Sequence, residues 1–165
     1  MIVFDSSTLI LLAKTELIDA VISGYKGVIL MTGTVMAEIT AKESLDGLLI
    51  KKLVETGKIK VKITTGNEII KLMKDFNIDK GEAETIAAPL KNPGSLVATD
   101  DRNAIKACKL IGLPFATSMG FLIKLQKERL LSKERALTML EKLSNFGRYR
   151  SEIVENARSK ITGGL

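Results

Sequence analysis

The fold of this chain is decided by its first stretch, Met-Ile-Val-Phe-Asp-Ser-Ser, residues 1–7. Three apolar residues run directly into a carboxylate and two hydroxyls. A short continuous apolar run is typical of a strand buried on both faces, as the central strands of parallel sheets are. Open parallel α/β sheets bind their ligands at the carboxyl ends of the strands. Asp5, Ser6 and Ser7 follow the strand at this end, so the sequence predicts a functional site there.

The rest of the chain alternates between strand-like and helix-like patterns. Further strands are expected at residues 28–31, 58–63, 95–99 and 114–116. The second of these alternates lysine with β-branched side chains, which is typical of a half-exposed edge strand. Helical patterns occupy residues 8–14, 15–22, 35–41, 46–56, 66–76, 79–89, 102–111, 118–126, 133–143 and 150–161. This alternation predicts an α/β fold, a three-layer sandwich with a mainly parallel central sheet and a helical C-terminal segment.

The amino-acid composition excludes several kinds of catalytic and metal-binding site. The 165 residues predict a single domain, with an α/β core over residues 1–125 and C-terminal helices over residues 126–165. Histidine is absent and Cys108 is the only cysteine, which excludes imidazole catalysis and thiolate zinc sites. No apolar run is long enough for a membrane span, and no basic region precedes the first apolar run, so we expect a cytoplasmic protein without membrane contact.

The net charge of +6 is concentrated near the C-terminus. Residues 1–120 hold 15 basic and 14 acidic side chains, whereas residues 121–165 hold 10 and 5. A basic segment on a neutral body can steer a polyanion towards it, and it can equally be a solvated helix face. Under the first interpretation, Lys124, Lys127 and Arg129 contact the phosphates of a nucleic-acid polyanion.

Acidic residues recur at the ends of predicted strands and near the starts of helices. After Asp5, these are Glu38, Glu82, Glu84 and the pair Asp100-Asp101. Carboxylates that converge above one sheet edge repel one another unless a hard cation neutralises them. Oxygen ligands favour Mg²⁺ or Mn²⁺, which lower the pKa of bound water and clamp a scissile phosphate.

Each acid also has a purely structural interpretation. Asp5 can cap the helix that follows it, and one of Asp100 and Asp101 is expected to be an N-cap. Glu82 lies three residues after Asp79, the spacing of a capping box. Glu38 can be an ordinary exposed helix residue. The case for a site therefore rests on the shared placement of the acids.

Four motifs, taken in order, resemble a PIN domain of the prokaryotic group related to VapC-type toxins. They are Asp-Ser-Ser after the first strand, Val-Met-Ala-Glu-Ile with Glu38, Gly-Glu-Ala-Glu-Thr-Ile-Ala, and Val-Ala-Thr-Asp-Asp-Arg. The resemblance implies a Rossmann-like sheet and an endoribonuclease that uses one or two Mg²⁺ or Mn²⁺ ions. The acids that match the family pattern, as catalytic and metal-binding residues, are Asp5, Glu38, Glu82 and Asp101, with Asp100 as a further metal ligand.

The sequence departs from the family pattern at two places. The third acid is often Asp in the family, and here it is one of two glutamates, of which the spacing to the following Ile-Ala-Ala favours Glu82 over Glu84. The fourth acid usually follows Thr by two residues, which selects Asp101 over Asp100. Secondary partners for the metal or the phosphate are expected at Ser6, Ser7, Glu84, Thr99 and Arg102.

The resemblance further implies the toxin of a toxin–antitoxin pair, with RNA as substrate, an antitoxin protein as possible partner, and a homodimer. The apolar faces of the last three helices are the expected interface for the antitoxin or for a second copy. An alternative from another class stays open: a PIN-like module that binds RNA or protein with weak cleavage or none, because a fold by itself does not establish a function.

Overall fold

The computed structural model describes residues 1–163 and confirms the α/β prediction. Five parallel strands form one sheet in the order β3-β2-β1-β4-β5. The strands are β1 (Ile2–Phe4), β2 (Ile29–Thr32), β3 (Lys60–Lys62), β4 (Leu96–Ala98) and β5 (Phe115–Ala116). The last two residues of the C-terminal segment expected over 126–165 lie outside the described residues.

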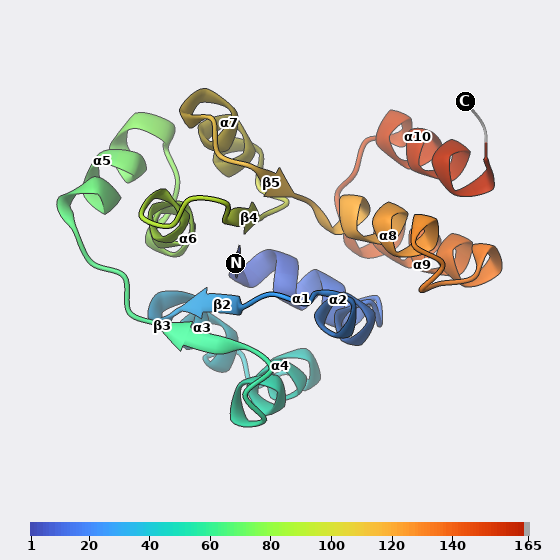
Figure 1. Cartoon of the computed structure of the whole chain (residues 1–165), viewed down its shortest axis with the longest axis horizontal. Helices are drawn as coiled ribbons and strands as arrows, with labels where there is room; N and C mark the ends of the chain where they lie inside the picture. The colour runs from blue at the N-terminus through green and yellow to red at the C-terminus, as the bar shows by residue number, and fades with distance from the viewer. Residues whose placement is uncertain (164–165) are drawn as a thin grey trace.

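Helices connect the strands and complete the chain (Figure 1). They are α1 (Ser6–Lys14), α2 (Ile18–Gly24), α3 (Gly33–Thr40), α4 (Leu45–Glu55), α5 (Asn67–Phe76), α6 (Lys80–Leu90), α7 (Arg102–Ile111), α8 (Ser118–Lys127), α9 (Lys133–Phe146) and α10 (Ser151–Thr162). Each expected helix is present, with ends that differ by a few residues.

One of these differences is at the start of α3. The sequence pattern places the start of this helix at Val35, whereas it begins at Gly33. Thr32 is the N-cap, and its hydroxyl accepts a hydrogen bond from the amide of Val35 (3.3 Å). A threonine at the end of a strand can therefore cap the next helix without an intervening turn.

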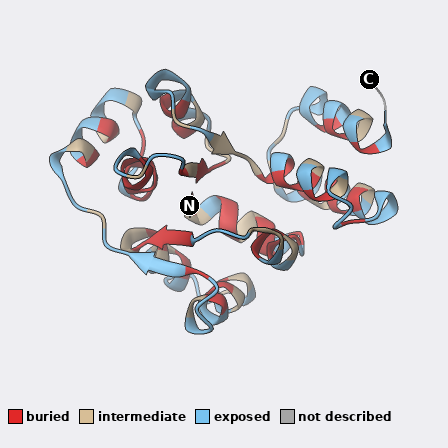
Figure 2. Ribbon diagram, in the orientation of Figure 1, coloured by how far each residue is buried: buried red, intermediate tan, exposed pale blue. Residues whose placement is uncertain are grey.

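The two faces of the sheet bury separate hydrophobic clusters, which makes the fold three-layered. Ile2 and Phe4 of β1 pack with residues of α1, α2, α4 and the last three helices. Val97 of β4 packs on the other face with residues of α5, α6 and α7. Alternate residues of a strand point to opposite faces, so a short buried strand serves both layers. Figure 2 shows buried residues on the facing sides of the strands and helices.

Strand β3 forms one of the two edges of the sheet, as the alternating pattern predicts. This strand pairs only with β2, and all three of its residues are exposed (Figure 2). Lysines on such an edge discourage pairing with further strands.

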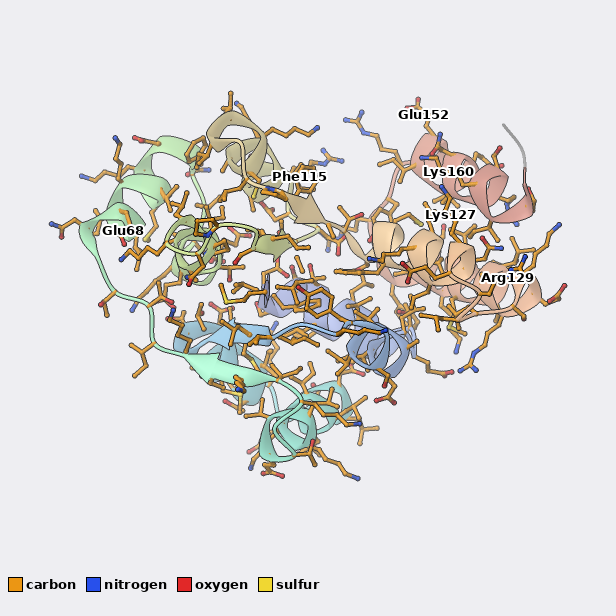
Figure 3. The ribbon with its side chains drawn as sticks, viewed as in Figure 1. Glu68, Phe115, Lys127, Arg129, Glu152 and Lys160 are labelled. Atoms are coloured by element: carbon orange, nitrogen blue, oxygen red, sulfur yellow. The ribbon has the colours of Figure 1, made fainter. Side chains whose placement is uncertain are left out.

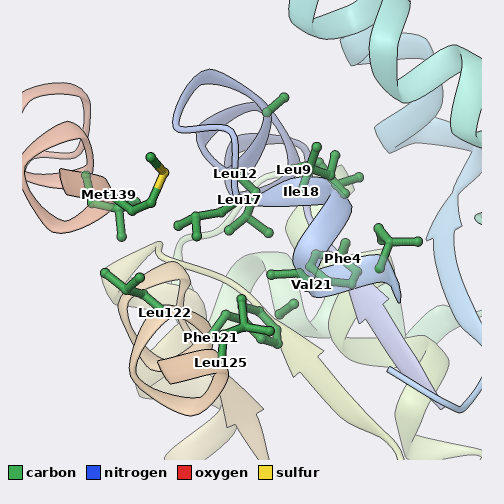
Figure 4. Packing of buried hydrophobic residues seen from close by; sticks show 14 of the residues in the cluster. Phe4, Leu9, Leu12, Leu17, Ile18, Val21, Phe121, Leu122, Leu125 and Met139 are labelled. Carbon is green, nitrogen blue, oxygen red and sulfur yellow. The ribbon is translucent and has the colours of Figure 1, made fainter. Parts of the chain in front are cut away.

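The last three helices belong to the main core. The rings of Phe4 in β1 and Phe121 in α8 are stacked with their centroids 5.6 Å apart. Figure 4 shows Phe121, Leu122 and Leu125 of α8 beside residues of α1 and α2, with Met139 of α9 nearby. Much of the apolar surface of these helices is therefore buried inside the chain, whereas Phe146 of α9 and Ile153 of α10 are exposed, and a partner interface on these helices stays a prediction.

The order of the strands reverses at β1. The chain adds β2 and β3 on one side of β1, and β4 and β5 on the other. Such a reversal opens a crevice at the carboxyl ends of the two central strands, and this is where ligands of open α/β sheets bind. The residues that follow β1 and β4 are Asp5 and the segment Thr99-Asp100-Asp101.

Candidate active site

Asp5 lies in the crevice between the ends of β1 and β4. Its amide donates a hydrogen bond to the carbonyl of Ala98 (3.1 Å), which fixes it beside β4. Its carboxylate is 2% exposed, and Oδ1 accepts a hydrogen bond from the amide of Thr8 (2.7 Å) as the N-cap of α1. Oδ2 is buried and receives no hydrogen bond from any of residues 1–163. A buried carboxylate oxygen without a partner is costly, and a cation or a proton removes that cost.

The pKa of Asp5 reflects this environment. Burial raises the pKa of the carboxyl from 3.8 to about 6, and the nearby charge of Asp100 adds to the increase. Perturbed carboxyls of this kind are common at functional sites, although structural networks also produce them.

Glu82 adds a second perturbed carboxyl. It stands in the first turn of α6 and forms the capping box that its spacing predicts. Glu82 Oε2 accepts a hydrogen bond from the amide of Asp79 (3.0 Å), and Asp79 Oδ1 accepts one from the amide of Glu82 (2.8 Å). Burial, together with smaller contributions from the charges of Asp101, Asp79 and Asp5, raises the pKa of Glu82 to about 7. Glu82 therefore lies within electrostatic reach of both Asp5 and Asp101.

Asp101 is the N-cap of α7. Its Oδ1 accepts hydrogen bonds from the amides of Asn103 (2.7 Å) and Ala104 (2.8 Å). Its own amide donates to the hydroxyl of Thr99 (3.1 Å). Capping thus uses one carboxylate oxygen, and the second receives no hydrogen bond from the described residues.

The caps and the acid cluster share the same residues. Asp5, Glu82 and Asp101 each use one oxygen near the start of a helix, namely α1, α6 and α7. The positive ends of three helices therefore meet at this edge of the sheet, and they favour the negative charge gathered there. A capping role and a site role are consequently compatible at each of these residues.

Glu38 approaches the same edge from α3. Its Oε2 accepts a hydrogen bond from the hydroxyl of Ser6 (2.6 Å). A Cβ atom placed on Gly81 would lie 2.6 Å from Glu38 Oε1. The absence of a side chain at position 81 thus allows α6 to pass close to the Glu38 carboxylate, next to Glu82.

Glu84 lies apart from this group. It is buried, its Oε1 accepts a hydrogen bond from the hydroxyl of Thr34 (2.8 Å), and the amine of Lys80 lies 3.7 Å away. These contacts of Glu84 are with Thr34 and Lys80, and neither partner is one of the acids that follow β1 and β4.

Asp100 is held on both oxygens, by residues that the sequence analysis did not identify. Oδ2 accepts hydrogen bonds from the hydroxyls of Ser118 (2.5 Å) and Thr8 (3.2 Å), and the amide of Ser118 also donates to the carboxylate. Oδ1 accepts a hydrogen bond from the hydroxyl of Tyr149 (2.6 Å). Ser118 follows the last strand, a position from which it could have been inferred. Tyr149 is 49 residues away, and no local pattern identifies it.

The remaining expected residues lie on the surface. Ser7 and Arg102 are exposed close to the acids in sequence. Lys124 forms an ion pair with Glu128 (3.6 Å). Helix α8 starts at Ser118, which contacts Asp100, and a helix rises about 1.5 Å per residue, so Lys127 lies about 13 Å further along α8. Figure 3 shows Lys127 and Arg129 towards the far end of α8.

The donors suit a hard divalent cation, although they do not surround one. The described residues contain no group of three or more Asp, Glu, Cys or His side chains placed to hold a metal ion. The unpartnered Oδ2 of Asp5 and the uncapped oxygens of Glu82 and Asp101 are nevertheless the hard ligands that Mg²⁺ and Mn²⁺ prefer. The donor chemistry therefore fits such an ion.

Within residues 1–163, no helix has both the length and the apolarity that crossing a membrane requires. No curated protein and no solved structure matches the chain. A family model described as a PIN domain matches residues 1–162, which is nearly the whole chain. The parallel sheet and the acids at its carboxyl edge agree with this match. The chain therefore belongs to the PIN-domain family, whose members are usually nucleases and generally use divalent metals.

Proposed function

We propose that this protein is a divalent-metal-dependent endoribonuclease that hydrolyses RNA phosphodiester bonds. The observation that carries the proposal is the buried, unpartnered Oδ2 of Asp5 in the crevice where the strand order reverses. The raised pKa of Glu82, which the charges of Asp5 and Asp101 increase, supports it.

The proposed ligands of Mg²⁺ or Mn²⁺ are Asp5, Glu38, Glu82 and Asp101, with Asp100 beside them. When bound, such an ion lowers the pKa of a coordinated water and neutralises charge on the scissile phosphate. The chain itself supplies the positioning. Ser6 orients Glu38, and the helix caps fix one oxygen each of Asp5, Glu82 and Asp101. The N-termini of α1, α6 and α7 favour the phosphate as they favour the acids.

The basic C-terminal segment is the proposed RNA surface, in which Lys124, Lys127 and Arg129 contribute long-range attraction. We further propose that the protein is the toxin of a toxin–antitoxin pair, with an antitoxin protein as partner, and that it forms a homodimer. The resemblance of the four acidic motifs to VapC-type toxins motivates this assignment. Induced expression should arrest growth, and a small neighbouring reading frame with a DNA-binding pattern should relieve the arrest.

A nuclease assay tests the proposed activity. Purified protein is incubated with single-stranded RNA in 5 mM Mg²⁺, in 5 mM Mn²⁺ or in EDTA, roughly the range in which weak Mg²⁺ sites fill. Cleavage with either metal and none in EDTA is the expected result. Asp5→Asn is the matched variant, because asparagine caps a helix nearly as well as aspartate and so preserves the fold.

One observation favours a second candidate, a PIN-like module that binds RNA or protein and cleaves weakly or not at all. The acids within residues 1–163 are not already arranged around a metal. This alternative predicts RNA binding that is the same in Mg²⁺ and in EDTA, and no cleavage in either condition.

A further inference from the structure

The connection between α9 and α10, residues 147–150, reaches back to the acid site. Its sequence is Gly-Arg-Tyr-Arg. The hydroxyl of Tyr149 donates to Asp100 Oδ1 (2.6 Å), and the half-buried ring packs against the main hydrophobic core. The 147–150 segment is therefore tied to the end of β4.

Gly147 allows the tyrosine to take this place. A Cβ atom at position 147 would overlap the ring of Tyr149 and would lie 2.8 Å from the carbonyl oxygen of Leu143. The ring thus lies directly against the glycine at the end of α9. The segment is held at two points, by this close packing and by the hydrogen bond to Asp100.

Two arginines flank the anchored tyrosine. Arg148 and Arg150 are exposed, and neither forms an ion pair with any residue of the described range 1–163. Each arginine is a direct chain neighbour of Tyr149, so each lies one residue from the contact with Asp100.

Their position matters because the acid site repels RNA. A phosphate that approaches Asp5, Glu82 and Asp101 meets their negative charge unless cations lie close by. The amine of Lys80 is engaged with Glu84, and Lys127 is about 13 Å along α8 from the Asp100 contact. Arg148 and Arg150 are nearer in the chain to a side chain that touches the site, and arginine pairs well with phosphate.

We propose that the 147–150 segment is an RNA-backbone contact of the acid site, in which Arg148 and Arg150 bind phosphates that flank the scissile one and Tyr149 holds them beside Asp100. The proposal deepens the proposed ribonuclease function and rests on it. It distinguishes these arginines from the basic residues of α8, which attract RNA only at longer range.

A pair of double variants with the same charge change tests the proposal. Arg148→Gln/Arg150→Gln is compared with Lys127→Gln/Arg129→Gln, in which both residues are also exposed. Binding of a labelled single-stranded RNA is measured in EDTA, where no cleavage occurs, at several salt concentrations. We expect the first pair to lose about tenfold or more in affinity at 0.1 M salt, and its salt slope to fall by about 1.4, because two phosphate contacts are lost. The second pair should lose less than about threefold.

Tyr149→Phe gives a second measurement that does not depend on charge. It removes only the hydroxyl, so the core contact of the ring remains. We expect a loss of about threefold in RNA affinity with an unchanged salt slope, since both arginines are still present but less well placed. Far-UV circular dichroism that matches the wild type confirms that the variant is folded.

Several results would overturn the inference. Equal losses for the two double variants would mean that only net charge matters. An equal loss of affinity for a polyglutamate peptide would indicate a general anion surface. Failure of the proposed function is a different outcome: wild-type protein that binds RNA through Arg148 and Arg150 but cleaves none in Mg²⁺ or Mn²⁺ supports the contact and refutes the nuclease.

Discussion

Two carboxylates that follow neighbouring strands differ sharply in their surroundings. Asp5 comes directly after β1, and one of its carboxylate oxygens is buried without a hydrogen bond from residues 1–163. Asp100 comes two residues after β4, and both of its carboxylate oxygens accept hydrogen bonds, from Thr8, Ser118 and Tyr149. A carboxylate whose hydrogen bonds are satisfied within the protein stabilises the fold. One that is buried without a partner costs stability, and such a cost indicates a bound ligand. The comparison supports the proposed binding role of Asp5 and favours a structural role for Asp100.

The largest expected effect comes from Asp5→Asn. The substitution keeps the cap on α1 and removes the charge that we propose binds the metal. We expect cleavage of RNA to fall by about 100-fold or more, with a melting temperature in EDTA no lower than that of the wild type. Single-turnover rates and thermal melts measure the two quantities. A variant that cleaves at the wild-type rate would remove Asp5 from the site.

The two glutamates of α6 provide the next test. Glu82→Gln should lower cleavage by about 10- to 100-fold, because Glu82 is coupled to Asp5 and Asp101. Glu84→Gln should change it by less than about threefold, since its partners are Thr34 and Lys80. Both rates are measured on the same RNA. The opposite ranking would mean that the binding region extends to β2 and that Glu84 is the ligand.

Gly81→Ala tests the position of the Glu38 carboxylate without replacing any acidic residue. The added methyl group would collide with Glu38 Oε1, so the flexible end of that side chain has to move. We expect a several-fold loss of cleavage and no loss of stability, because alanine favours helices by up to about 1 kcal/mol over glycine. Gly120→Ala in α8 is the control, as its new methyl group meets only an ordinary contact. If both variants keep full activity, Glu38 does not need its present position.

Asp100→Asn tests the other half of the comparison. An asparagine amide presents a donor where Tyr149 and Ser118 already donate, so at least one hydrogen bond to a charged acceptor is lost. We expect a loss of about 1–3 kcal/mol in the free energy of unfolding, measured by urea titration. RNA binding in EDTA reports whether the 147–150 segment also shifts. A variant as stable as the wild type would contradict the structural role.

The smallest effect is a pH dependence of stability. The pKa values of Asp5 and Glu82 are raised in the folded protein, to about 6 and about 7, so the folded state binds protons that the unfolded chain releases between about pH 4 and 7. Their contribution to stability is therefore greatest at low pH and is lost as pH rises through this window. In EDTA, we expect the wild type to lose roughly 1–2 kcal/mol more than Asp5→Asn from pH 5 to 7.5, or about 3–6 °C in melting temperature.

At neutral pH, bound Mg²⁺ should restore the stability that the protein loses when Asp5 and Glu82 ionise. With an assumed dissociation constant of about 1 mM, 10 mM Mg²⁺ stabilises the folded state by about 1.4 kcal/mol. The gain should largely vanish in Asp5→Asn and persist in Asp100→Asn. Equal gains in all three proteins, in melts at constant ionic strength, would place the metal elsewhere.

The sequence alone determined the features that depend on near neighbours. Apolar runs and helical periodicity identified the strands and helices, and the spacing of Asp79 and Glu82 identified their capping box. The residues that end β1 and β4 could be assigned to one sheet edge because parallel strands share a direction. Local hydrogen bonds and side-chain periodicity span only a few residues, so a sequence pattern records them.

Only the tertiary structure decided which carboxylate oxygens receive hydrogen bonds. Asp5, Asp100 and Asp101 look alike in sequence, and their differences arise from partners brought from α8 and from the connection after α9. Packing likewise decided which apolar residues of the last three helices are buried in the core and which, such as Phe146 and Ile153, stay exposed. These features depend on where distant segments pack, and that position is set by the sum of many contacts across the chain rather than by any local pattern.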